Sequence, residues 1–149
     1  MKRLCCVLLL LMLTGCVGEK APPRPVLRFE NTPVSLTQGD FALHGALTFG
    51  GVDGVKLTVE SPPALQGFVF ELRQGEMSIT RGSVTVPGQT GGCVGELLQA
   101  VRRFDLEEIV FQNGTWQLSG EEIFLTADAA GVPQGMWGGD WQADFWETE

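Results

Sequence analysis

One cysteine flanked by glycines is the part of the sequence closest to catalytic machinery. Residues 91–95 read Gly-Gly-Cys-Val-Gly, the spacing of a nucleophile elbow on a strand-to-helix turn. That elbow needs a parallel, doubly wound sheet and a histidine late in the chain, whereas the single histidine, His44, precedes Cys93 in an alternating segment. We therefore interpret Cys93 as a half-buried residue at a glycine-rich helix entry and His44 as a solvent-facing strand residue. We expect no enzyme activity.

Metal and cofactor chemistry is not indicated either. His44 has no second histidine, and no cysteine, at ligand spacing. The acidic pairs at 107–108 and 121–122, with Asp128, could gather as paired carboxylates or bind calcium, but no Asp-x-Asp-x-Asp-Gly loop is present. A Walker loop, a dinucleotide fingerprint and a G-x-S-x-G motif are also missing from the sequence. We predict solvated charges, no metal and no cofactor.

Four tryptophans occur without any tyrosine, at positions 116, 137, 141 and 146. Such side chains can form an aromatic platform for a ligand or a membrane-facing edge. They can equally be ordinary core and rim residues, and the sequence leaves these alternatives open.

The first residues indicate export. Lys2 and Arg3 form a charged start, and Leu4 to Leu13 is an apolar run too short to span a bilayer as a mature helix. Leu-Thr-Gly-Cys then ends at Cys16. This pattern resembles the signal peptide and lipobox of bacterial lipoproteins, which implies that residues 1–15 are cleaved and that Cys16 carries a diacylglycerol. The resemblance predicts a chain anchored by lipid on the extracytoplasmic side of a cell-envelope membrane.

The remaining chain has the size and composition of one domain. Residues 16–25 are rich in proline and predict an extended tether, followed by a single β-rich domain over residues 26–149. The net charge is −8, which disfavours nucleic acid as a partner. Without Cys5, Cys6 and the lipidated Cys16, Cys93 has no cysteine to pair with, so apolar burial must hold the fold together.

Alternating apolar and polar residues predict many short strands and one helix. Val94, Leu97, Leu98 and Val101 follow the helical i, i+3, i+4, i+7 pattern, which predicts an amphipathic helix over residues 93–104. Gln74-Gly75 and Asn113-Gly114 predict hairpin turns, and residues 31–40 and 131–135 predict loops. Strands are predicted at 26–29, 41–49, 55–60, 68–73, 76–80, 84–86, 109–111, 116–118, 123–125 and 141–146. We predict an α+β, mostly β fold, with a curled antiparallel sheet, or half-open barrel, covered by the helix.

The stretch Ser-Pro-Pro-Ala-Leu-Gln-Gly-Phe-Val-Phe over residues 61–70, between hairpins of a lipid-anchored chain, resembles the lipoprotein-localisation carriers. In that Lol-type family a half-open antiparallel barrel closes over helices and holds acyl chains in its apolar mouth. The carriers have an amphipathic helix before their first strand, where this chain has the proline-interrupted residues 19–40. The lid implied by the resemblance is therefore incomplete.

Two functions of different classes follow. The first is a non-catalytic module that binds a lipid or another apolar ligand on the concave face of the sheet. The second is an envelope structural or interaction lipoprotein whose interior is filled by side chains and takes no ligand; the sequence identifies no protein partner for it. A cavity would favour the first and a filled core the second. The candidate apolar face consists of Phe41, Leu43, Leu57, Phe68, Phe70, Leu97 and Leu98.

Overall fold

The computed structural model describes residue 23 and residues 26–50, 54–103, 108–120 and 122–146. The predicted signal segment, the lipidation site Cys16 and most of the predicted tether lie outside these residues. Within the described part, no helix is long and apolar enough to cross a membrane. The elements are β1 (Thr32–Gln38), β2 (Phe41–Phe49), β3 (Val55–Ser61), β4 (Phe68–Arg73), β5 (Glu76–Arg81), β6 (Val84–Pro87), α2 (Gly92–Arg103), β7 (Glu108–Gln112), β8 (Thr115–Ser119), β9 (Ile123–Asp128), β10 (Pro133–Gly138) and β11 (Trp141–Phe145).

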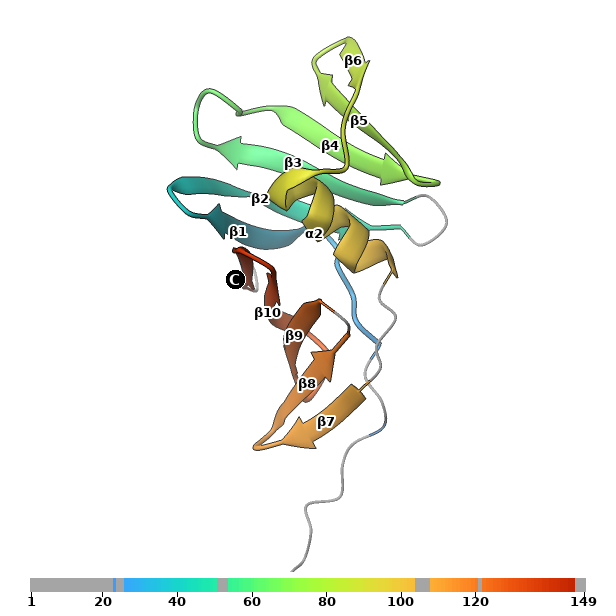
Figure 1. The fold of residues 1–149 in the computed structure, drawn as a ribbon, viewed down its shortest axis with the longest axis vertical. Helices are drawn as coiled ribbons and strands as arrows, with labels where there is room; N and C mark the ends of the chain where they lie inside the picture. The colour runs from blue at the N-terminus through green and yellow to red at the C-terminus, as the bar shows by residue number, and fades with distance from the viewer. Residues whose placement is uncertain (1–22, 24–25, 51–53, 104–107, 121, 147–149) are drawn as a thin grey trace, which may run out of the picture.

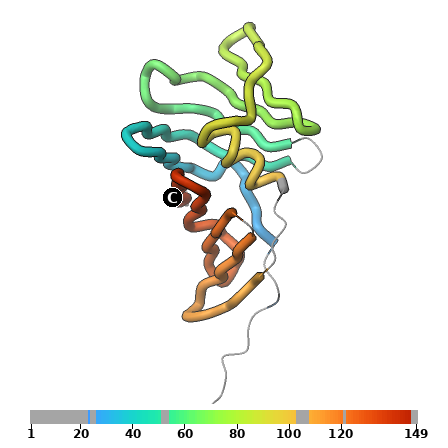
Figure 2. The backbone as a smooth tube through the Cα atoms, in the orientation of Figure 1, coloured from blue at the N-terminus to red at the C-terminus, as the bar shows by residue number. Residues whose placement is uncertain are grey.

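The strands form one antiparallel sheet in the order β6-β5-β4-β3-β2-β1-β11-β10-β9-β8-β7. Strands β1 to β6 make one meander and β7 to β11 a second, and the pairing of β1 with β11 joins them (Figure 2). The sheet curls, and α2 crosses in front of it (Figure 1). Among the described residues β6 and β7 are the free edges, so the sheet is not closed into a barrel. The predicted α+β, mostly β fold with a curled antiparallel sheet and one covering helix is confirmed.

The core lies between α2 and the inner face of the sheet, which we define as the face toward the helix. Helix α2 contacts β1, β3 and β4. Its side chains Leu97, Leu98 and Val101 are buried and Val94 is half-buried, as the apolar stripe predicts. The predicted helix over 93–104 is observed as Gly92–Arg103, and residue 104 lies outside the described residues.

Two predicted loops are strands. Residues 26–29 form no strand; β1 instead occupies 32–38, where the fully buried Val34 and Leu36 alternate with Ser35 and Thr37. Pro33, near the start of β1, sits where a strand tolerates the missing N–H. Residues 133–138 form β10, and a register shift between Pro133 and Gly135 accommodates the irregularity that predicted a break.

Both predicted hairpin turns are confirmed. Gln74 and Gly75 join β4 to β5 with φ of 52° and 91°, and Asn113 and Gly114 join β7 to β8 with φ of 53° and 75°. Positive φ at both central residues matches the right-handed twist of the flanking strands.

Candidate functional site

Helix α2 contacts β1, β3 and β4 and leaves the inner face of the sheet uncovered toward β6. Leu47, Leu57, Phe70, Ile79 and Val86 lie opposite one another on successive strands from β2 to β6, so all five side chains share the inner face. The first two are fully buried, the next two are half-buried, and Val86 is 47% exposed. Helix α2 therefore covers the middle of the sheet and leaves apolar surface open on the flank formed by β4, β5 and β6.

An open depression of about 530 Å³ lies on this uncovered flank, and we call it the apolar hollow. It is bounded by β5, the start of α2, the loop 87–91 and the beginning of β2. Its volume falls within the range of small-molecule sites. The side chains that give it apolar character are those of Phe41, Phe70, Met77, Ile79, Pro87, Cys93 and Val94.

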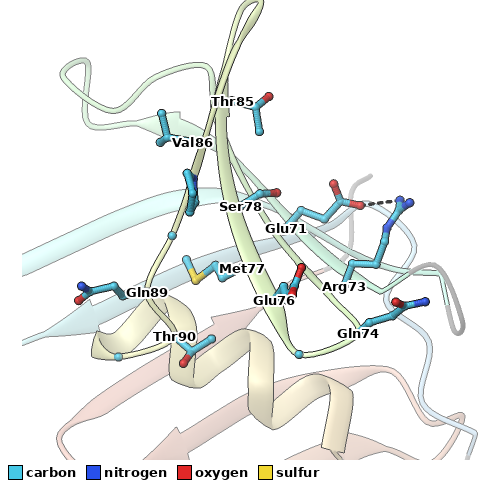
Figure 3. A pocket seen from close by; sticks show the side chains of 14 residues that line it. Glu71, Arg73, Gln74, Glu76, Met77, Ser78, Thr85, Val86, Gln89 and Thr90 are labelled. Carbon is cyan, nitrogen blue, oxygen red and sulfur yellow. Dashed lines mark hydrogen bonds and ion pairs between the residues drawn. The ribbon is translucent and has the colours of Figure 1, made fainter.

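A second, larger depression of about 1070 Å³ is lined by the same loop 87–91 together with residues of β4, β5 and β6, and we call it the polar hollow (Figure 3). Arg73 Nη2 and Glu71 Oε1 form an ion pair of 2.8 Å at its rim. Both groups are solvated, so the pair contributes little to stability. Met77 lines both hollows. The two depressions thus share the loop as a wall, and only one of them is mainly apolar.

The loop 87–91 is held on both sides. Gly88 donates its backbone N–H to the Met77 carbonyl at 2.8 Å, and Gln99 Nε2 donates to the Thr90 carbonyl at 2.9 Å. A Cβ added to Gly95 would meet the Thr90 carbonyl oxygen, so glycine at this position lets the first turn of α2 pack against the loop. The glycine-rich segment predicted as a helix entry therefore builds the wall of the apolar hollow.

Cys93 and His44 lie on opposite sides of the sheet. Cys93 is buried at the start of α2, and this burial is the largest cause that raises the pKa of its thiol above the ordinary value. His44 is exposed on the outer face, where it pairs with Ser35. A raised pKa opposes the thiolate that nucleophilic chemistry needs. The structure does not bring the two groups together.

The seven residues of the candidate apolar face divide into two groups. Leu43, Leu57, Leu97 and Leu98 are 0% exposed and belong to the filled core. Phe41, 37% exposed, and the half-buried Phe70 line the apolar hollow. Phe68 is half-buried beside them, its ring 6.5 Å from that of Phe70 and 4.9 Å from the Arg81 guanidinium carbon.

Five of the apolar lining residues were not among those candidates: Met77, Ile79, Pro87, Cys93 and Val94. Met77 and Ile79 alternate with polar residues along β5, and Val94 opens the helical stripe, so each carried the signal of an apolar face. These residues lie at the open end of the inner face because α2 stops covering the sheet there. No local sequence pattern shows where that happens.

The tryptophans and the acidic residues have separate roles. Trp116 and Trp141 are buried, Trp137 is half-buried and Trp146 is 45% exposed, so they do not form one platform. Asp128 Oδ1 accepts hydrogen bonds from the backbone N–H groups of Ala130 and Val132, each at 2.8 Å, and so shapes a turn. In the part of the chain that the structure describes, no three His, Cys, Asp or Glu residues are grouped so as to hold a metal ion.

Comparison with known proteins gave one structural similarity. No protein-family model matches the chain, and no curated protein sequence matches it. The crystal structure of a LolA superfamily protein from Nitrosomonas europaea is similar with a TM-score of 0.40 and 11% sequence identity. The similarity covers 74% of this chain and 65% of that protein, which is less than two thirds of its length.

Proposed function

We propose that this protein is a non-catalytic binding module that takes a lipid acyl chain, or a ligand of similar apolar character, in the apolar hollow. The observation that carries this proposal is the uncovered inner face itself. Phe70 and Ile79 continue the apolar rows of the core, yet they border an open depression of about 530 Å³. When a ligand removes apolar surface of this kind from water, the free energy of the complex falls, so binding is favoured.

We further propose that the module works at a membrane, anchored through diacylglycerol on Cys16. The support is the sequence of residues 1–16, which combines a charged start, a short apolar run and a small-residue cleavage site closed by cysteine. Two acyl chains suffice for stable anchoring without a basic patch, which suits a chain with a net charge of −8. The ligand then comes from, or is delivered to, the extracytoplasmic side of that membrane.

An envelope structural lipoprotein without a ligand is the second candidate. The full burial of Leu43, Leu57, Leu97 and Leu98 favours it, because the centre of the inner face holds side chains and not a ligand. The two candidates differ only in whether the flank beside the core is occupied.

Native mass spectrometry of the protein purified from cells tests the proposal. We expect a lipid adduct on the wild-type protein and its loss in Phe41→Glu, since a carboxylate at the hollow would have to be desolvated by an acyl chain. The matched control is Phe124→Glu, because Phe124 is 40% exposed but lies on the outer face. Retention of the adduct in Phe41→Glu would contradict the proposed site, and a wild type without any adduct would favour the structural lipoprotein.

A further inference from the structure

The outer face of the second meander carries an aromatic pair apart from both hollows. Phe124 and Trp137 are direct cross-strand neighbours on β9 and β10, with ring centroids 5.6 Å apart and planes inclined at 47°. Phe124 is 40% exposed and Trp137 is half-buried. Helix α2 lies on the opposite face of the sheet, so the core does not use this pair.

Gly135 lets the indole of Trp137 lie down on the sheet. A Cβ at Gly135 would come within 2.7 Å of Cη2 of Trp137, so the six-membered ring lies over this residue. Gly135 pairs directly with Asp144 on β11 and with Thr126 on β9. The six-membered ring of the half-buried Trp137 therefore occupies the space above Gly135, between the cross-strand neighbours Asp144 and Thr126.

Asp144 places a carboxylate next to that ring. Its Oδ1 accepts a hydrogen bond of 2.8 Å from Nε2 of Gln142, the residue that pairs directly with Trp137. This bond orients the carboxylate and leaves the second oxygen free to accept. A π-face beside an oriented carboxylate is the chemistry that recognises a guanidinium, which stacks on the ring and donates to the oxygens.

The distribution of charge also favours a positively charged ligand such as a guanidinium. All 10 lysine and arginine residues and the single histidine lie before residue 104, so the sequence that forms β7 to β11 has no basic side chain. The field over this half of the sheet is negative, attracts cations and disfavours anionic partners.

We propose that Trp137, Phe124 and Asp144 form a docking surface for an arginine-bearing segment of a protein partner. The arginine stacks on the indole of Trp137, and its N–H groups donate to Asp144. This surface lies on the face opposite the proposed ligand site, so the two can be occupied together.

Titration calorimetry with the purified full chain and a short arginine-containing peptide tests this surface. Replacing arginine by citrulline, which keeps the shape and loses the charge, controls for unspecific peptide binding. We expect Trp137→Ala and Asp144→Asn each to weaken binding by about three- to tenfold. Val84→Ala, at an exposed apolar residue on β6 at the opposite edge of the sheet, should leave binding unchanged. Binding should weaken between about 50 and about 300 mM salt.

Equal binding of the arginine and citrulline peptides would overturn the proposal, and this result does not depend on how any variant folds. Unchanged binding in both Trp137→Ala and Asp144→Asn would overturn it as well. Trp137-dependent binding of a neutral oligosaccharide, without binding of the arginine peptide, would assign the surface to glycans and also overturn it.

Discussion

Trp141 donates a hydrogen bond of 2.8 Å from its indole Nε1 to the Oε2 atom of Glu96. The bond ties α2 to the last strand, β11, across 45 residues of sequence. Trp141 is buried, and its ring covers Gly138 so closely that a Cβ there would lie 2.6 Å from the indole. The helix is thus fixed to the seam between the two meanders by a polar contact as well as by apolar packing.

Removal of that acceptor should destabilise the fold. We expect Glu96→Ala to lower the free energy of unfolding by about 1 to 3 kcal/mol, because it leaves a buried N–H without a partner. Glu96→Gln retains an acceptor oxygen of the same reach and should lose less. Urea unfolding of both variants measures the difference, and equal losses would show that the hydrogen bond does not contribute.

Leu98 and Val94 lie on the same apolar stripe of α2 but differ in burial. Leu98 is fully buried, so Leu98→Ala should cost about 2 to 5 kcal/mol. Val94 borders the apolar hollow, so Val94→Ala should cost clearly less, since its site is already incompletely packed. Denaturant midpoints with unchanged slopes would report both values, and similar losses would mean that the hollow is closed in solution.

Burial of Cys93 should make stability depend on alkaline pH. The pKa of this thiol is raised in the folded state, so the folded protein holds the thiol proton more tightly than the unfolded chain does. The resulting contribution to the free energy of unfolding is complete below the ordinary thiol pKa and is lost as pH rises through the raised value. We expect wild-type protein to lose stability relative to Cys93→Ala between neutral pH and about pH 10. The chain has no tyrosine that would titrate in this range. A constant difference across this interval would contradict the prediction.

Substitution of Cys16 tests the proposed anchor. We expect Cys16→Ala to leave the protein out of the membrane fraction, because lipid on this residue is the proposed attachment. Fractionation followed by immunoblotting measures the shift, and Cys93→Ala provides the control for loss of a cysteine elsewhere. A processed Cys16→Ala chain that still sediments with membranes would refute the anchor.

The fold class was predictable because apolar and polar residues alternate regularly along most strands. β1 was missed although Val34 and Leu36 alternate with Ser35 and Thr37, since the turn-forming residues on both sides of it, Asn31 and the pair Gly39-Asp40, predicted a loop. β10 was missed for a different reason. Gly135 and Gly138 have no side chains, and the space beside them is filled by the rings of Trp137 and Trp141, so neither face shows a pattern.

The candidate site was predictable only in part for a geometric reason. Strand alternation assigns Phe41, Leu57 and Phe70 to the inner face, but all three carry the same local signal. Whether each is core or exposed depends on how far α2 reaches over a curled sheet. The contacts of α2 with β1, β3 and β4, which no short sequence window contains, make Leu57 core and leave Phe70 at the edge.

The seam between β1 and β11 also determines the order in which the chain can fold. All other strand pairs join neighbours in sequence, so each meander can form by local hairpin closure, which is fast. The seam joins residues such as Thr37 and Gln142, which are 105 positions apart. Closing so long a loop costs conformational entropy. The pairing of β1 with β11 can form only after β11 has been synthesised. Until then β1 is an unpaired edge in the middle of the future sheet, and this is the stage at which the chain is most exposed to aggregation.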